Sequence, residues 1–305
     1  MRRDIKFDAN GTALRGWLYT PDRGPGPFPT IVMAHGFSAL KEMGLDEYAE
    51  VFAAAGLATL VYDNRTLGAS DGEPRFDIDP VAQMRDYRHA VTYAQFRPEV
   101  DADRIGIWGT SYTGGLVLIA AALDRRVKCV VSQVPFISGY ETMIRTALPD
   151  EREALYRMLN AERRSLLAGN PPSVVPICTD DPSKPTTAPG RRTYQYFRGY
   201  AHDKKLPWQN LVTTCSLDYR LEYEAMPYME RISPTPLLMI IASEDTITPT
   251  DIALSAFARA LEPKRAVLIR GDHYVAYAAG FGKSSAAARD WFSEHLLPTN
   301  PSQLK

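Results

Sequence analysis

One segment of this chain predicts a strand, a sharp turn and a helix with a serine at the apex of the turn. The segment 109–115 reads G-T-S-Y-T-G-G; an apolar run, 104–108, comes before it and a long apolar stretch, 116–123, follows it. Small residues around the turn let strand and helix approach closely and hold the serine in strained backbone geometry. We therefore expect the hydroxyl of Ser111 to stand above the carboxyl edge of a sheet. Such a pattern also arises by chance, so the rest of the chain has to support it.

The segments on both sides of this turn predict a sheet with helices between its strands. Alternation over 6–19, broken by Asn10-Gly11, predicts an antiparallel hairpin at the start of the chain. Short apolar runs predict buried strands at 30–34, 58–62, 127–132, 236–241 and 265–269. Helical spacing predicts helices over 46–55, 79–96 and 284–296. The fold class that fits this order is α/β, with a doubly wound and mainly parallel sheet.

The alternation of strands and helices stops between Pro135 and Ser233. We expect a core formed by 1–135 and 233–305, with an inserted lid over 136–232. The large apolar side chains of this insertion are candidates for lining a pocket and equally for packing on the core. They are Tyr194, Tyr196, Phe197, Tyr200, Trp208, Tyr219, Tyr223, Met226, Tyr228 and Met229.

Four of the predicted strands end at residues that can carry chemistry. The ends are His35-Gly36-Phe37, Ser111, Ser243-Glu244-Asp245 and Gly271-Asp272-His273. Because catalytic residues gather at the carboxyl edge of a parallel sheet, we expect these ends to meet there. If the serine turn matched the motif only by chance, we would not expect an acid and a histidine at the ends of other strands. The combination favours a serine nucleophile.

The catalytic residues that this pattern predicts are Ser111, His273 and Asp245. A serine hydroxyl is a weak nucleophile near neutral pH, so it needs a base such as a neutral imidazole within hydrogen-bond reach. A carboxylate on the other imidazole nitrogen fixes the tautomer and stabilises the cation that forms. We assign that role to Asp245, because its neighbour Glu244 tends to point the opposite way.

Two backbone amides are expected to form an oxyanion hole, which stabilises the charge of a tetrahedral intermediate. The amide of Tyr112 follows the nucleophile and lies at the positive end of the predicted helix. The amide of Phe37 follows Gly36, where the backbone can turn freely.

Other polar residues near these strand ends favour structural roles. His35 is expected to brace its loop, and the remaining histidines lack the spacing of metal ligands. The loop 63–72 is expected to be structural, and Asp63 and Arg65 could pair to hold it beside the site. We expect no metal and no cofactor.

Composition excludes several partners. The net charge of −1 over 305 residues gives no field that would attract nucleic acid or an anionic membrane. No window approaches the roughly 20 apolar residues of a membrane span, and the first residues lack the apolar core of a secretory signal.

Cysteines at 129, 178 and 215 show neither a disulfide framework nor a zinc pattern. A reduced, cytoplasmic protein is the default expectation.

The whole chain resembles the α/β-hydrolase superfamily. The loops at 35–36 and 63–72, the turn at Ser111, and then Asp245 and His273 fall in the order of that superfamily. The resemblance implies an α/β-hydrolase fold. One residue departs from the motif, because Thr113 stands where the general pattern has glycine.

Several segments are similar to a narrower group, the fungal polyketide transferases and thiohydrolases. They are 35–43, 62–65, 72–75, 78–80, 85–88 and 109–115. The resemblance implies that the serine takes an acyl chain from the thioester of a polyketide synthase carrier domain and passes it to water or to an alcohol. It implies a carrier-bound or small-molecule acyl substrate.

Two other functions remain compatible with these residues. The first is a carboxylesterase or a carbon-carbon bond hydrolase that acts on a small molecule, since the same three residues perform that chemistry. The second is a receptor that keeps the fold without catalysis, which the complete set of residues argues against.

Overall fold

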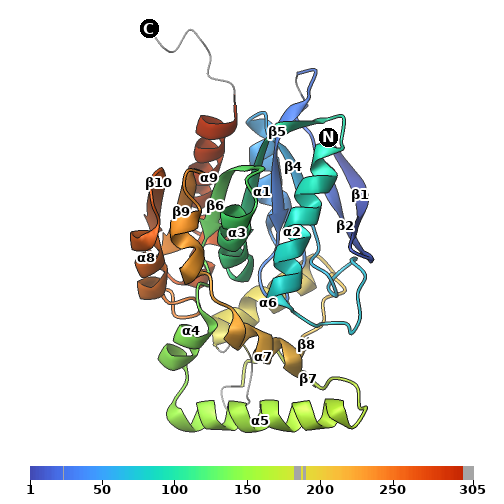
Figure 1. Cartoon of the computed structure of the whole chain (residues 1–305), viewed down its shortest axis with the longest axis vertical. Coiled ribbons are helices and arrows are strands. Elements are labelled where there is room, and N and C mark those ends of the chain that lie inside the picture. Colours follow the sequence, from blue (N-terminus) through green and yellow to red (C-terminus); the bar gives the residue numbers. More distant parts are fainter. Residues whose placement is uncertain (23, 182–186, 188–189, 298–305) are drawn as a thin grey trace.

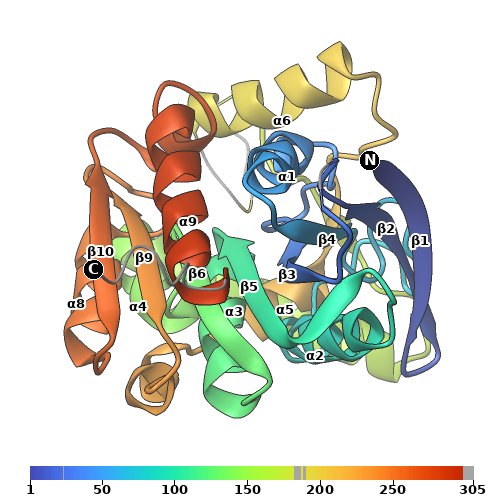
Figure 2. The same cartoon turned by 90° about the horizontal axis from the view of Figure 1, so that it is seen from above.

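The computed structural model describes the chain except for residues 23, 182–186, 188–189 and 298–305. Its central sheet has the strand order β1-β2-β4-β3-β5-β6-β9-β10 (Figures 1 and 2). The strands are β1 (Arg2–Ala9), β2 (Thr12–Tyr19), β3 (Phe28–Ala34), β4 (Ala58–Tyr62), β5 (Val100–Thr110), β6 (Val127–Gln133), β9 (Leu237–Ala242) and β10 (Lys264–Ile269). β1 and β2 form the predicted hairpin, β2 pairs antiparallel with β4, and the remaining pairs are parallel. The doubly wound, mainly parallel sheet is confirmed.

The hairpin turn and one helix start follow directly from local sequence. Asn10 and Gly11 adopt φ values of 56° and 84°, the left-handed conformation that a tight two-residue turn requires. α2 (Pro80–Gln95) begins with proline, and the side chain of Asp79 accepts hydrogen bonds from the Val81 and Ala82 amides. Proline needs no amide partner in the first turn, and aspartate satisfies two amides that have none within the helix.

Helices cover both faces of the sheet (Figure 2). α1 (Leu45–Ala54) and α9 (Phe281–Leu296) pack on one face, where their side chains share a core with Ile31 and Met33 of β3. α2, α3 (Tyr112–Leu123) and α8 (Thr250–Arg259) cover the other face, on which Val32 of β3 lies. Since β3 is covered on both sides, its successive residues from Pro29 to Ala34 are all buried, as the continuous apolar run predicts.

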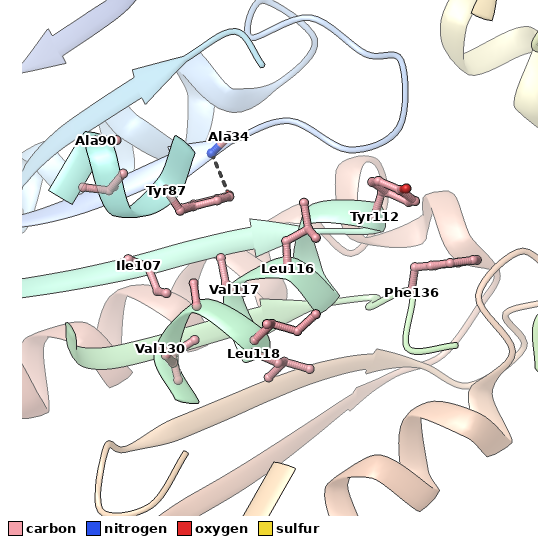
Figure 3. Close-up of a cluster of buried hydrophobic side chains, with 14 of the residues drawn as sticks. Ala34, Tyr87, Ala90, Ile107, Tyr112, Leu116, Val117, Leu118, Val130 and Phe136 are labelled. Atoms are coloured by element: carbon pink, nitrogen blue, oxygen red, sulfur yellow. Dashed lines mark hydrogen bonds between the residues drawn. The ribbon is translucent and has the colours of Figure 1, made fainter. Parts of the chain in front are cut away.

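α3 is the most completely buried helix that positions the site. Leu116, Val117 and Leu118 lie against Ile107 of β5 and Val130 of β6 in the same apolar cluster (Figure 3). Burial of each such side chain contributes roughly 1.5–3 kcal/mol to stability. This packing holds α3 against β5 and β6.

The segment between β6 and β9 gathers at one end of the molecule (Figure 1). It contains α4 (Gly139–Thr146), α5 (Pro149–Leu167), β7 (Val174–Val175), α6 (Arg191–Asp203), β8 (Val212–Thr213), α7 (Thr214–Glu222) and the 3-10 helix η1 (Met226–Arg231). That 136–232 act as a lid stays a prediction. None of the helices in the described part of the chain is long and apolar enough to cross a membrane.

Candidate active site

Ser111 occupies a strained turn between β5 and α3. Its φ and ψ angles are 55° and −119°, a conformation that L residues seldom adopt. The turn is tight, because a Cβ atom on Gly109 would lie 2.2 Å from the carbonyl oxygen of Thr113. The Ser111 amide donates to the carbonyl of Gln133 at 2.9 Å, which ties the turn to the end of β6.

The residue that departs from the motif, Thr113, stabilises this turn. Its Oγ1 accepts a hydrogen bond from the Thr110 amide at 3.0 Å and donates to the carbonyl oxygen of Ala34 at 3.0 Å. Ala34 is the last residue of β3, so the buried Thr113 hydroxyl connects the serine turn to a neighbouring strand end. A glycine at this position would lose both contacts.

His273 connects the hydroxyl of Ser111 to the carboxylate of Asp245. The Nε2 atom of His273 lies 3.0 Å from Ser111 Oγ, and its Nδ1 atom lies 2.7 Å from Asp245 Oδ2. His273 begins the short 3-10 helix η2 (His273–Tyr277), which follows β10, and Asp245 follows β9. The structure thus brings together three residues from three predicted strand ends, with His273 and Asp245 both buried.

The turn after β9 holds the Asp245 carboxylate as an anion. Oδ1 accepts hydrogen bonds from the Ile247 and Thr248 amides, and Oδ2 accepts one from the Thr248 hydroxyl at 2.8 Å. Burial raises the pKa of Asp245, but the charge of His273 and these donors outweigh it, so the pKa is lowered from its ordinary value. The neighbouring Glu244 is exposed, which agrees with the choice of Asp245 from the sequence.

The backbone at Gly36 lies close to the serine. A Cβ atom on Gly36 would stand 3.1 Å from Ser111 Cβ and 3.6 Å from Ser111 Oγ. The ring of Phe37 packs edge-on against the ring of Tyr112, 5.3 Å between centroids. Tyr112 is the first residue of α3, so its amide has no carbonyl one turn earlier to bind. The Tyr112 amide directly follows Ser111, and that it forms an oxyanion hole with the Phe37 amide stays a prediction.

His35 is completely buried and braces the loops around Gly36. The Asn64 amide donates to His35 Nε2 at 3.1 Å, and His35 Nδ1 lies 2.9 Å from the carbonyl oxygen of Gly36. Burial lowers the pKa of His35, although the Asp63 carboxylate 3.6 Å away opposes this. The neutral imidazole with its proton on Nδ1 satisfies both contacts.

The predicted pair of Asp63 and Arg65 is wrong. Asp63 binds the ammonium group of Lys41 at 2.7 Å, and Arg65 binds the carboxylate of Asp86 in α2, with its Nε atom 2.7 Å from Oδ2. Both acids are buried, so each needs a cation that the fold delivers from another segment. The loop still lies beside the site, because the Asn64 backbone amide donates to His35, which lines the pocket.

Aromatic rings line the pocket in front of Ser111. Its free volume of about 60 Å³ lies well below the roughly 300 Å³ or more of sites that enclose a whole drug-sized ligand. Phe37, Tyr196 and Phe197 of α6, and Tyr274 and Tyr277 of η2 line it. Only part of a larger substrate fits this conformation.

The other large side chains of the segment 136–232 mostly pack on the core. Of the ten candidates only Tyr196 and Phe197 line the pocket. Tyr223 and Met229 belong to the buried core, and Tyr194, Tyr200, Trp208, Met226 and Tyr228 pack against it. Tyr219 lines a separate hollow between α5 and α7. Packing on the core therefore explains most of the aromatic-rich stretch.

The sequence reasoning missed two residues that support the site. Thr248 holds Asp245, and Tyr277 lines the pocket with its hydroxyl hydrogen-bonded to Thr110 Oγ1. Thr110 Oγ1 also accepts from Gln133 Nε2 at 3.2 Å. Both residues lie three or four positions after a predicted catalytic residue, which is the one signal that could have found them.

Comparison with known proteins gives the chain relatives over nearly its whole length. The model of a family described as X-Pro dipeptidyl-peptidase (S15 family) matches residues 10–274. A thiohydrolase of Eupenicillium brefeldianum is 33% identical over 288 residues, which covers 92% of this chain and 89% of that protein. The polyketide transferase af380 of Aspergillus fumigatus is 32% identical over 301 residues, which covers 97% of this chain and 99% of that protein.

A solved structure agrees with these sequence relatives. The α/β-hydrolase GrgF from Penicillium sp. sh18 superimposes with a TM-score of 0.83 at 29% identity, and the match covers 97% of this chain and 99% of GrgF. The agreement extends across both the sheet and the segment 136–232, since so little of either chain is left out.

Proposed function

The chain belongs to the S15 family of α/β-hydrolases and to the family of the fungal polyketide transferases and thiohydrolases, and on this premise we propose that it transfers acyl groups through Ser111. That it is an enzyme of the hydrolase and transferase class follows from these relatives. The finer proposal concerns the residues and the substrate. One observation carries it: His273 lies within hydrogen-bond distance of both Ser111 and Asp245.

In the first step Ser111 attacks the carbonyl carbon of a thioester or ester. His273 takes the hydroxyl proton at Nε2, and the adjacent Asp245 carboxylate stabilises the resulting imidazolium. The tetrahedral intermediate places its negative oxygen between the Phe37 and Tyr112 amides. Its collapse breaks the bond to the leaving group, and the proton on His273 passes to the departing thiolate or alkoxide. The acyl group stays on Ser111 as an ester.

In the second step water or an alcohol attacks this ester. His273 removes the proton of the incoming hydroxyl, and the second tetrahedral intermediate releases Ser111 with its proton restored. Water gives a free acid, and an alcohol gives a new ester. The same residues serve both outcomes, so the acceptor depends on what reaches the acyl-enzyme.

The proposed substrate is a polyketide acyl chain on the thioester of a synthase carrier domain. The names of the relatives support this class, and so does the apolar pocket. A dipeptidyl-peptidase activity, after which the S15 family is named, is less well supported. Binding of a peptide amino terminus calls for a carboxylate in the pocket, and the described residues that line it include no Asp or Glu.

Labelling with a fluorophosphonate probe tests the nucleophile. The wild type should gain one mass equivalent, whereas Ser111→Ala should gain none and His273→Ala should react far more slowly. Ser243→Ala is the matched control, because this serine directly follows β9 but is not among the residues that line the pocket, and the variant should label fully. Labelling of Ser111→Ala at another serine would overturn the assignment.

Turnover of acyl thioesters tests the substrate. Acyl N-acetylcysteamine thioesters and aryl esters of the same acyl groups should be incubated with the enzyme, with and without an alcohol, and the products weighed by mass spectrometry. We expect Ser111-dependent cleavage of the thioesters. Cleavage of the aryl esters alone would make the protein a carboxylesterase and contradict the thioester proposal.

A further inference from the structure

Tyr196, in the middle of α6, forms part of the wall of the pocket in front of the candidate nucleophile. Its ring contacts the rings of Tyr274 and Tyr277 of η2, with 4.9 and 5.4 Å between centroids. Its hydroxyl donates a hydrogen bond to the carbonyl oxygen of Met43 at 3.3 Å. Tyr196 is therefore attached to η2 through its ring and to the segment before α1 through its hydroxyl.

The helix that carries Tyr196 is attached to the core near both of its ends. Near its start, the Nε atom of Arg192 lies 2.8 Å from Oδ2 of Asp272, which directly precedes η2. At its end, the Nζ atom of Lys204 lies 2.9 Å from Oδ2 of Asp46 in the first turn of α1, and α6 lies beside α1 (Figure 2). Two ion pairs at opposite ends of one helix oppose both a tilt and a shift of that helix over the pocket.

The residue after Tyr196 adds buried contacts to these exposed ones. Phe197 also lines the pocket and is 6% exposed, and its ring stacks on the ring of Trp208 with 5.2 Å between centroids. The indole N–H of Trp208 donates to the carbonyl oxygen of Ser38 at 2.8 Å, in the loop after β3. Because exposed ion pairs contribute little to stability and buried aromatic rings contribute more, Phe197 and Trp208 hold α6 in place more firmly than its ion pairs do.

The space that these walls leave in front of Ser111 is small. Its free volume of about 60 Å³ corresponds to roughly two water molecules, since each takes about 30 Å³ in the liquid. A methylene group is of similar size. The lining near the start of α1 is apolar and consists of Ala39, Met43 and Leu45. An acyl group whose carbonyl carbon lies at Ser111 therefore has room for roughly two further carbons inside these walls.

We propose that Tyr196 limits the length of the acyl group at Ser111, so that the enzyme prefers short acyl chains, from acetyl to butanoyl, over long ones. A longer chain has to displace the Tyr196 ring, which costs its contacts with Tyr274 and Tyr277. Phe197, in contrast, packs into the buried core. The inference rests on the proposed acyl transfer, and it narrows the substrate of that reaction to a short polyketide chain.

Turnover of propanoyl, hexanoyl and octanoyl thioesters of N-acetylcysteamine tests this limit. For the wild type, kcat/KM should fall at least tenfold from propanoyl to octanoyl; an open apolar groove gives the opposite order, because each methylene adds buried surface. Tyr196→Ala should remove most of that fall, whereas Tyr196→Phe keeps the ring and should keep the wild-type order. Tyr194→Ala is the matched control, because Tyr194 lies on the same helix and packs on the core without lining the pocket.

Labelling with phosphonofluoridates that carry methyl, propyl or octyl on phosphorus separates this inference from the proposed substrate. The rate of labelling at Ser111 should fall with alkyl length in the wild type and recover for octyl in Tyr196→Ala, or in Tyr196→Leu if the alanine variant does not fold. This result without thioester cleavage supports the length limit and contradicts the thioester substrate. Equal rates for the three probes in the wild type, or an octyl rate that neither variant raises, would overturn the limit and leave acyl transfer intact. Absence of labelling by every probe would overturn acyl transfer and the limit that rests on it.

Discussion

The Nδ1 atom of His35 lies 2.9 Å from the carbonyl oxygen of Gly36, and this carbonyl belongs to the same peptide unit as the Phe37 amide. In a planar trans peptide the C=O and N–H groups point in opposite directions. By binding the carbonyl, His35 therefore directs the Phe37 amide away from itself and toward the proposed oxyanion. The hydrogen bond also polarises the peptide and strengthens the amide as a donor.

The first prediction concerns this hydrogen bond. His35→Ala should lower kcat roughly 10- to 100-fold, less than the roughly 10²- to 10³-fold loss that follows removal of a whole oxyanion donor. KM should change little, because the ground-state carbonyl depends less on this amide than the transition state does. Steady-state kinetics on an acyl thioester checks it. His89→Ala on α2 is the control, and a rise in KM at constant kcat would speak against the role.

The second prediction concerns Thr113, where the general motif has glycine. Thr113→Gly should lower the free energy of unfolding by about 2–4 kcal/mol, because it strands the buried Thr110 amide and places a glycine in α3. Urea denaturation measures this loss. Thr113→Ser keeps the hydroxyl and should lose much less. If Thr113→Gly proved as stable as the wild type, the two hydrogen bonds of the hydroxyl would contribute nothing to the free energy of unfolding.

The strand ends were predictable from the sequence because they depend on local patterns. The apolar run 30–34 continues into His35-Gly36-Phe37, and the same logic places Asp245 and His273 directly after β9 and β10. In a parallel sheet every such end reaches the same edge. Residues far apart in the chain therefore meet without any knowledge of side-chain contacts.

The partners of those residues were not predictable in this way. Lys41 reaches Asp63 from a different loop, and Asp86 reaches Arg65 from a helix, so neighbouring charges in the sequence gave the wrong pair. Such contacts depend on how separate segments pack, and single-sequence patterns do not carry that information.

The third prediction concerns Thr248, a positioning residue. Thr248→Val keeps the shape of the side chain but removes the hydrogen bond to Asp245 Oδ2. A hydrogen bond to a charged group contributes about 1.5 kcal/mol or more, so kcat/KM should fall roughly tenfold. The pKa of Asp245 should rise, because one of the donors that lower it is gone. The pH at which kcat/KM falls because Asp245 becomes protonated should therefore be higher in the variant.

The control for that experiment is Thr248→Ser, which retains the hydroxyl and should recover most of the rate. Rates should be measured across the pH range on one thioester. A fall in rate with an unmoved profile would mean that Thr248 acts only through packing.

The last prediction concerns stability and Asp245. The pKa of this carboxyl in the folded protein lies below its ordinary 3.8, so the folded state binds the proton more weakly than the unfolded state. Such a group stabilises the fold fully above pH 3.8, and that contribution disappears as the pH falls through the lowered pKa. Asp245→Asn should thus lose more unfolding free energy relative to wild type at pH 6 than at pH 3. Urea denaturation at both values measures the difference. If the difference in unfolding free energy between wild type and Asp245→Asn stays constant or grows toward pH 3, the pKa of Asp245 is not lowered.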